Sequence, residues 1–178
     1  MRRILATLAV VVALLFSSGS AWADFDDGRA IMLRADYAAA FREFRPLAEQ
    51  GDAGAQFNLG LMYSRGLGVP ENDAEAVKWY RKAAEQGHAD AQTLIGMMYA
   101  GGLGVPKNDA EAVKWFHKAA EQGIAQAQFN LGNMYADGTG VPEDDAEAAK
   151  WFCKAAKQGC EGISLIDTPA LPLATVAV

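Results

Sequence analysis

Apolar residues return every three or four positions in two neighbouring segments of the chain, AQFNLGLMY at residues 55–63 and DAEAVKWYRKAA at residues 73–84. This spacing places them on one face of an α-helix. In order along the chain they are Ala55, Leu59, Met62, Tyr63, Ala76, Trp79, Tyr80, Ala83 and Ala84. The pattern therefore predicts two amphipathic helices joined by a short connection.

The same pattern is repeated at intervals of 36 residues. The segment GLGVPENDAEAVKWYRKAAEQG, residues 66–87, returns with few changes at residues 102–123 and 138–159. The copies run without a gap over residues 55–90, 91–126 and 127–162. One helical hairpin cannot bury its apolar face alone, so a repeat of this length predicts hairpins stacked on one another. We predict an all-α fold, an α-solenoid of three full hairpins.

Glycine, tyrosine and tryptophan keep constant positions in all three copies. A glycine inside the first helix costs about 1 kcal/mol relative to alanine, so its retention predicts a close approach between helices. A second glycine can end this helix in the left-handed conformation. The tryptophan and the aromatic residue after it are expected to fill the space between hairpins. These structural positions are Gly60, Tyr63, Gly66, Trp79, Gly96, Tyr99, Gly102, Trp115, Gly132, Tyr135, Gly138 and Trp151.

The start of each second helix has a capping pattern. An amide or acid stands just before the helix, and a glutamate follows three residues later, which predicts an N-cap with a reciprocal capping box. The N-cap residues are Asn72, Asn108 and Asp144, and the glutamates are Glu75, Glu111 and Glu147.

The two ends of the repeated region differ from its middle. Residues 24–54 are expected to form a degenerate N-terminal capping hairpin, because Gly51 precedes Gly87 by 36 residues and Phe41 and Phe44 supply an apolar face. Residues 163–178 depart from the pattern, with Ile163 in place of the expected alanine and two prolines after it. This apolar tail can fold over the last hairpin, pair with another molecule or remain loose.

The segment AQFNLGLMYSRGLGVPENDAEAVKWYRKAAEQG resembles a Sel1-like repeat, a helical-hairpin relative of the tetratricopeptide repeat, and the resemblance covers about residues 51–159. It implies a non-enzymatic adaptor in envelope, secretion or host-facing complexes. Cysteine-rich members of the group are associated with penicillin binding or hydrolysis, which leaves a β-lactam-binding or β-lactamase-like activity as the alternative. This chain lacks their repeated cysteine pairs and has Ala84, Ala120 and Ala156 at the ends of its second helices.

The first 23 residues have the pattern of a secretory signal peptide. Arg2 and Arg3 precede the apolar run of residues 4–16, and Ala21 and Ala23 stand where a signal peptidase cuts. The run is shorter than the roughly 20 apolar residues of a membrane-spanning helix. We therefore expect cleavage after Ala23, a periplasmic or secreted protein and no stable membrane span.

Charge narrows the choice of partners. The full chain has a formal net charge of −6, and removing Arg2 and Arg3 leaves 14 basic and 22 acidic residues, a charge of −8. An acidic protein offers no counter-charge to nucleic acid or to an anionic membrane surface. The expected partner is a protein or peptide.

The sequence predicts no catalytic, metal or cofactor site. Its two histidines, His88 and His117, stand at positions that other copies fill with Ile124 and Arg81, which indicates surface positions. Cys153 occupies the same position as Arg81, and we expect an exposed or half-buried thiol. Whether Cys153 and Cys160 form a disulfide is left undecided by the sequence. Seven residues of continuous helix would separate their Cα atoms by about 10.5 Å, so a bond would need the chain to turn back after Gly159.

Residues that differ between copies gather on one side of the first helix. In a helical projection, positions 57, 58, 61, 64 and 65 and their equivalents share this side, while the opposite arc is constant and predicts packing. First helices line the concave side of such solenoids, where partners bind. The candidate partner-binding residues are Asn58, Leu61, Arg65, Leu94, Met97, Asn130, Asn133 and Asp137. Leu61, Leu94 and Met97 are expected to form exposed apolar patches.

Overall fold

The computed structural model describes residues 28–32 and 35–159, and within these ranges every element of regular secondary structure is a helix. A helical turn at residues 28–32 precedes seven helices. Their bounds are α2 (Tyr37–Glu49), α3 (Ala53–Arg65), α4 (Asp73–Glu85), α5 (Ala89–Gly101), α6 (Asp109–Glu121), α7 (Ala125–Ala136) and α8 (Asp145–Gly159). The predicted signal peptide (1–23), Cys160 and the tail (163–178) lie outside the described residues.

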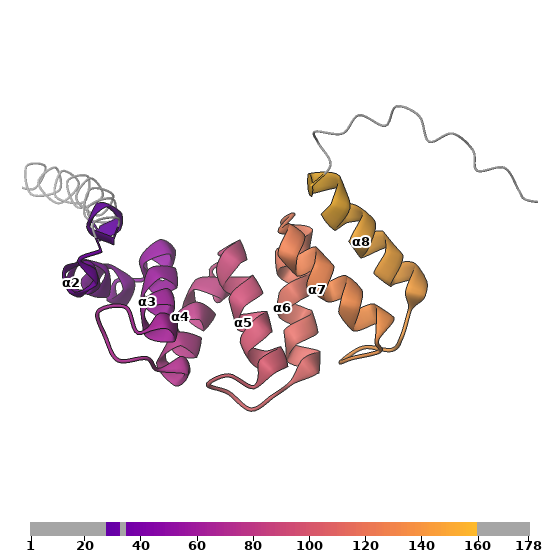
Figure 1. The fold of residues 1–178 in the computed structure, drawn as a ribbon, viewed down its shortest axis with the longest axis horizontal. Coiled ribbons are helices and arrows are strands. Elements are labelled where there is room, and N and C mark those ends of the chain that lie inside the picture. Colours follow the sequence, from indigo (N-terminus) through magenta and orange to yellow (C-terminus); the bar gives the residue numbers. More distant parts are fainter. Residues whose placement is uncertain (1–27, 33–34, 160–178) are drawn as a thin grey trace, which may run out of the picture.

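The helices form a row of antiparallel hairpins in which each helix packs against the next one in sequence. Figure 1 shows this row as a curved stack whose two ends lie above its middle in the view. The predicted α-solenoid is confirmed. None of the described helices combines the length and the apolar character that a membrane crossing needs.

Three apolar clusters make up the core, and each joins two successive hairpins. The middle cluster contains Tyr80 from α4, Ile95 from α5 and Trp115 from α6. The last cluster repeats the arrangement with Phe116, Leu131 and Trp151. The tryptophan of each second helix therefore packs back into the preceding hairpin, as the repeat predicts. Trp115 and Trp151 are 9% and 5% exposed, whereas Trp79 is half-buried against the first cluster.

The glycine inside each first helix allows an aromatic ring to lie against the backbone. A Cβ atom on Gly96 would lie 2.7 Å from Cε1 of Phe116, and one on Gly60 would lie 2.5 Å from Cδ1 of Tyr80. Gly132 meets Phe152 in the same way. The close helix approach predicted from these glycines is confirmed, and the loss of helix propensity is offset by packing.

Buried glutamines connect one hairpin to the next, a feature absent from the predictions. The Nε2 atom of Gln92 donates to the carbonyl of Ala84 at 3.0 Å, and its Oε1 atom accepts from Gln122 at 2.7 Å. Gln56 makes the equivalent bonds to Ala48 and Gln86 at 3.0 and 2.8 Å. These bonds satisfy polar side chains that are only 4% exposed.

The helix ends are as predicted at Gly66 and Gly102 and only partly as predicted at Gly138 and at the caps. Helix α7 ends at Ala136 with Asp137 as its C-cap, and Gly138, with a φ of 62°, comes one residue later. Gly66 and Gly102 end α3 and α5 in the left-handed conformation, with φ values of 64° and 68°. The side chain of Asn108 accepts from the backbone N–H of Glu111 at 3.0 Å, which confirms the N-cap. Asn72 and Asp144 do the same for α4 and α8.

The prediction that the glutamate completes a reciprocal capping box, by accepting from the backbone N–H of the N-cap residue, is wrong. The backbone N–H of Asn108 donates to the carbonyl of Tyr99 at 2.9 Å, and the carboxylate of Glu111 pairs with Lys114 instead. The other two units repeat this arrangement. The loop brings the cap amide to a carbonyl near the end of the first helix, so that the cap needs no second acceptor from its own glutamate.

Replacing the middle cap tests this assignment. Asn108→Ala is expected to lower the free energy of unfolding by about 1 kcal/mol, because the N–H of Glu111 loses its acceptor. Urea denaturation followed by helical circular dichroism measures the change. Lys114→Ala, which removes an exposed ion pair from the same turn, is the control and should change stability by less than about 0.5 kcal/mol. Equal losses of unfolding free energy in both variants would contradict the role of Asn108 as the N-cap.

Candidate functional site

Burial separates the two sides of each first helix almost as predicted. The constant arc is buried, for example Ala55, Leu59 and Met62 on α3. The variable arc is half-buried or exposed, with one exception. Thr93 was expected on the variable side but is 6% exposed, and its hydroxyl donates to the carbonyl of Ala89.

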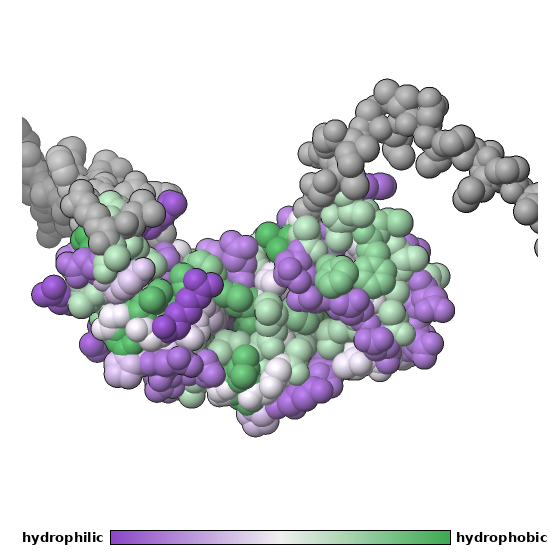
Figure 2. Space-filling model, in the orientation of Figure 1, coloured by the Kyte–Doolittle hydropathy of each residue, from purple (hydrophilic) through white to green (hydrophobic). Residues whose placement is uncertain are grey.

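Four of the candidate residues line one pocket between α5 and α7. Met97 approaches from α5, and Asn130, Asn133 and Asp137 approach from α7 or its end. The pocket has a volume of about 450 Å³. Figure 2 shows apolar and neutral residues across the middle of the visible face, with hydrophilic residues mostly around its lower edge and ends.

The pocket offers both apolar and polar groups to a ligand. Met97 is 45% exposed, which is high for a large apolar side chain. Asn130 accepts from Gln126 through Oδ1 at 3.0 Å. Asn133 makes no side-chain hydrogen bond within the described residues and is half-buried. Its amide is therefore positioned to bond with a partner.

Charged groups in the pocket come from two places. Lys107 in the loop before α6 pairs with Asp109 at 3.3 Å, and Asp137 follows the last residue of α7. A carboxylate at a helix C-terminus interacts unfavourably with the helix dipole. Asp137 is exposed and makes no ion pair within the described residues. Packing therefore gives no reason for an acid at this position.

Lys107 and Asp109 were missed by the sequence predictions, which treated this loop as a joint. Position 107 does vary between copies, with Glu71 and Glu143 as its equivalents. Its charge reversal is the same kind of signal that selected the variable side of the first helices.

The other four candidate residues do not line this pocket. Leu61 is half-buried, and Leu94 packs against the middle core cluster, so the expected exposed patch reduces to Met97. Asn58 donates to the carbonyl of Gly54 in its own helix at 2.9 Å. Arg65 is exposed in the last turn of α3, where its charge suits the helix dipole.

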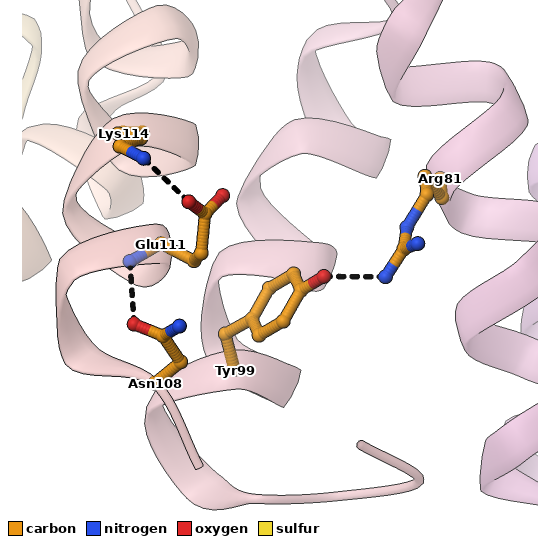
Figure 3. Close-up of polar contacts among 5 residues, drawn as sticks. All are labelled: Arg81, Tyr99, Asn108, Glu111 and Lys114. Carbon is orange, nitrogen blue, oxygen red and sulfur yellow. Dashed lines mark hydrogen bonds and ion pairs between the residues drawn. The ribbon is translucent and has the colours of Figure 1, made fainter. Parts of the chain in front are cut away.

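The polar contacts on the second helices are structural. Figure 3 shows the guanidinium of Arg81 from α4 directed at the hydroxyl of Tyr99 from α5, beside the cap formed by Asn108. Each tryptophan of a second helix also has a lysine ammonium over its ring, 4.3 Å from the ring centroid for Lys118 over Trp115.

Titratable groups do not converge on a catalytic arrangement among the described residues. His88 is half-buried, accepts from the N–H of Ala91 and stacks on Phe57 at 4.6 Å, so it is an N-cap rather than a surface residue. His117 lies over the edge of Trp151. Burial raises the pKa of the Tyr80 phenol, which shares a hydrogen bond with Ser64.

Metal-ligating side chains are likewise dispersed. Across residues 28–32 and 35–159, no three His, Cys, Asp or Glu side chains are grouped as ligands for a metal ion. Cys153 is exposed, in agreement with the sequence prediction. The same residues do form a pocket between α5 and α7.

Comparison with known proteins identifies the repeating unit. Residues 53–88, 89–124 and 125–160 each match the Sel1 repeat. These matches begin two residues before the repeat boundaries expected from the sequence, at the first residues of α3, α5 and α7. No curated protein matches the chain.

Two solved structures share both fold and sequence with this chain. A Sel1 repeat protein from Oxalobacter formigenes is 39% identical with a TM-score of 0.72, covering 75% of this chain and 55% of that one. The protein c5321, a protective antigen present in uropathogenic Escherichia coli strains and displaying an SLR fold, is 42% identical with a TM-score of 0.76. That match covers 83% of this chain and 32% of the antigen. The chain thus spans about half of the first protein and a third of the second.

A more distant structure shares the fold alone. Cysteine rich protein B of Helicobacter pylori is 21% identical with a TM-score of 0.52, over 77% of this chain and 92% of that protein.

Proposed function

Because this chain belongs to the Sel1 repeat family, we propose that it is a non-enzymatic binding module that takes a protein or peptide partner on the concave face of its first helices. Sel1 repeats generally mediate protein interactions, and proteins built from them are typically scaffolds. The observation that carries the proposal is the pocket between α5 and α7, which gathers Met97, Asn130, Asn133 and Asp137.

The chemistry of this pocket suggests the kind of peptide it takes. Met97 offers a flexible apolar contact, and the amides of Asn130 and Asn133 can pair with the backbone of an extended peptide. The charged lining residues are Lys107, which is already paired with Asp109, and Asp137. Asp137 is therefore the acid in the pocket that has no counter-charge among the lining residues. The partner segment therefore carries an apolar side chain close to a basic one.

The proposal places the module outside the cytoplasm. It rests on the basic, apolar and small-residue order of residues 1–23, which lie outside the described part of the chain. Fractionation of cells that express the full chain checks this, and a variant that lacks the apolar run of residues 4–16 is the control. Recovery of the uncleaved chain in the cytoplasm would contradict export.

A displayed library of random peptides tests the binding site. The chain from Asp24 onward is expected to select peptides with an apolar residue beside a basic one. Met97→Asp is expected to weaken the selected peptides by about tenfold, because one exposed anchor side chain contributes about 1.4 kcal/mol. Isothermal titration measures the affinities.

The matched control is Leu103→Asp, since Leu103 is 51% exposed and does not line the pocket. It makes the same change of an exposed apolar residue to an acid, and the affinity should change by less than twofold. Equal binding by both variants, with helical circular dichroism unchanged, would remove the pocket as the binding site.

A further inference from the structure

The last hairpin of the described chain has an uncovered apolar face. A groove of about 630 Å³ lies between α7 and α8, lined by Ala125, Gln126, Phe129, Phe152, Ala155 and Ala156. None of these side chains is charged, and Phe129 is 49% exposed. Green residues gather over α7 and α8 in Figure 2, toward the C-terminal end of the stack.

The same positions are covered in the preceding unit. Phe116, Ala119 and Ala120 are 3%, 0% and 2% exposed, because α7 packs over them. Their equivalents 36 residues later, Phe152, Ala155 and Ala156, are half-buried or exposed. The described residues therefore leave uncovered, in the last hairpin, the positions that the preceding unit buries.

The segment that follows α8 has the composition of a covering piece. Ten of the sixteen residues from Ile163 to Val178 are Ala, Val, Ile or Leu, and Asp167 is the one charged residue among them. A groove without charged groups and a segment with a single charge are complementary, because neither buries an unpaired ion on contact. Only three residues separate Gly159 from Ile163.

This segment cannot cover the groove as a fourth first helix. In the 36-residue register, Asp167 takes the place of Leu131, which is 0% exposed. A carboxylate there would be buried without a partner. Pro169 and Pro172 also lack the backbone N–H that a helix interior needs.

We propose that residues 163–178 lie across the groove between α7 and α8 as a non-helical strap that closes the C-terminal end of the stack. Ile163 is within about 14 Å of the end of α8, at up to 3.6 Å per residue. So short a connection gives the strap an effective concentration on the order of millimolar. A second copy of the chain, at micromolar concentration, competes poorly for the same face.

Hydrogen exchange measured by mass spectrometry on the chain from Asp24 to Val178 tests the strap. Amides between residues 163 and 176 are expected to exchange at least about tenfold more slowly than in an unstructured peptide. Phe129→Asp places a charge in the groove and should abolish this protection. Leu103→Asp, at a similarly exposed apolar residue that does not line the groove, should leave it unchanged.

A variant within the strap keeps the test decisive if Phe129→Asp disturbs the last hairpin. The double variant Leu171→Asp, Leu173→Asp leaves all helices intact and should lose the protection of the strap as well. Unprotected amides in the unaltered chain would overturn the proposal, and so would protection that survives both variants. Protection that fades on hundredfold dilution would assign the groove to a second copy instead. The strap is independent of the peptide pocket, and neither result depends on the other.

Discussion

Trp115→Ala is expected to lower the free energy of unfolding by about 3 to 5 kcal/mol, the cost of truncating a large buried aromatic side chain. Trp115 lies on α6, is 9% exposed and packs into the cluster formed by α4 and α5. Its removal opens a cavity between two hairpins. It also takes away the ring beneath Lys118. The loss therefore falls on the contact between repeats rather than on one helix.

Denaturant titration followed by circular dichroism measures this loss. Trp79→Ala is the matched control, because Trp79 holds the equivalent position 36 residues earlier and is only half-buried. Its truncation should cost less, about 2 kcal/mol, in proportion to the smaller area removed from water. A loss near zero for Trp115→Ala, or a larger loss for Trp79→Ala, would mean that the tryptophans do not join the hairpins as described.

Gly104→Ala is expected to cost about 3 to 4 kcal/mol. Gly104 has a φ of +67°, where a side chain costs about 1 to 2 kcal/mol. A Cβ atom there would also lie 2.4 Å from the carbonyl carbon of Asp73, in the backbone at the start of α4. Backbone cannot rotate away as a side chain can, so the two units must separate, at about 1 to 3 kcal/mol more.

Gly87→Ala separates these two contributions. Gly87 also has a positive φ, +91°, but a Cβ atom there would meet no atom within 4 Å. The loss should be limited to backbone strain, about 1 to 2 kcal/mol. Thermal or urea unfolding of both variants gives the comparison. Equal losses at Gly87 and Gly104 would show that the loop does not press on the preceding repeat.

The contact at Gly104 recurs and was not predictable from the sequence. Gly68 lies against the backbone of Tyr37, and Gly140 lies against that of Asp109, each 31 residues earlier. The repeat indicated a turn at these glycines, which is correct within one unit. Their contact with the preceding unit depends on how far the hairpins rotate relative to each other, and no local pattern carries that rotation.

The helices themselves were predictable because their signals are local. The apolar spacing, the glycines that end the first helices and the capping asparagines act within about one turn of chain. The helix ends were confirmed at Gly66 and Gly102 and the N-cap at Asn108. The glycines inside the first helices also indicated close packing correctly. Strict repetition made these signals visible, since three copies share them.

The candidate site was predictable only in part, for the same physical reason. Met97, Asn130, Asn133 and Asp137 come together because α5 and α7 are neighbouring first helices. Leu94 was expected to be exposed and instead packs against the core, while Thr93 is buried. A helical projection gives the direction of a side chain from its own axis. It does not give the position of the neighbouring hairpin that covers it.

The most direct test of the account is to locate a bound peptide on the stack. A peptide selected by the chain and carrying a nitroxide label broadens the nuclear magnetic resonance signals of nearby amides. Binding on the first helices predicts broadening of residues around Met97 on α5 and around Asn130 and Asn133 on α7. Broadening confined to the second helices, around Lys78 and Arg81 on α4, would contradict the assignment of function to the variable side of the first helices.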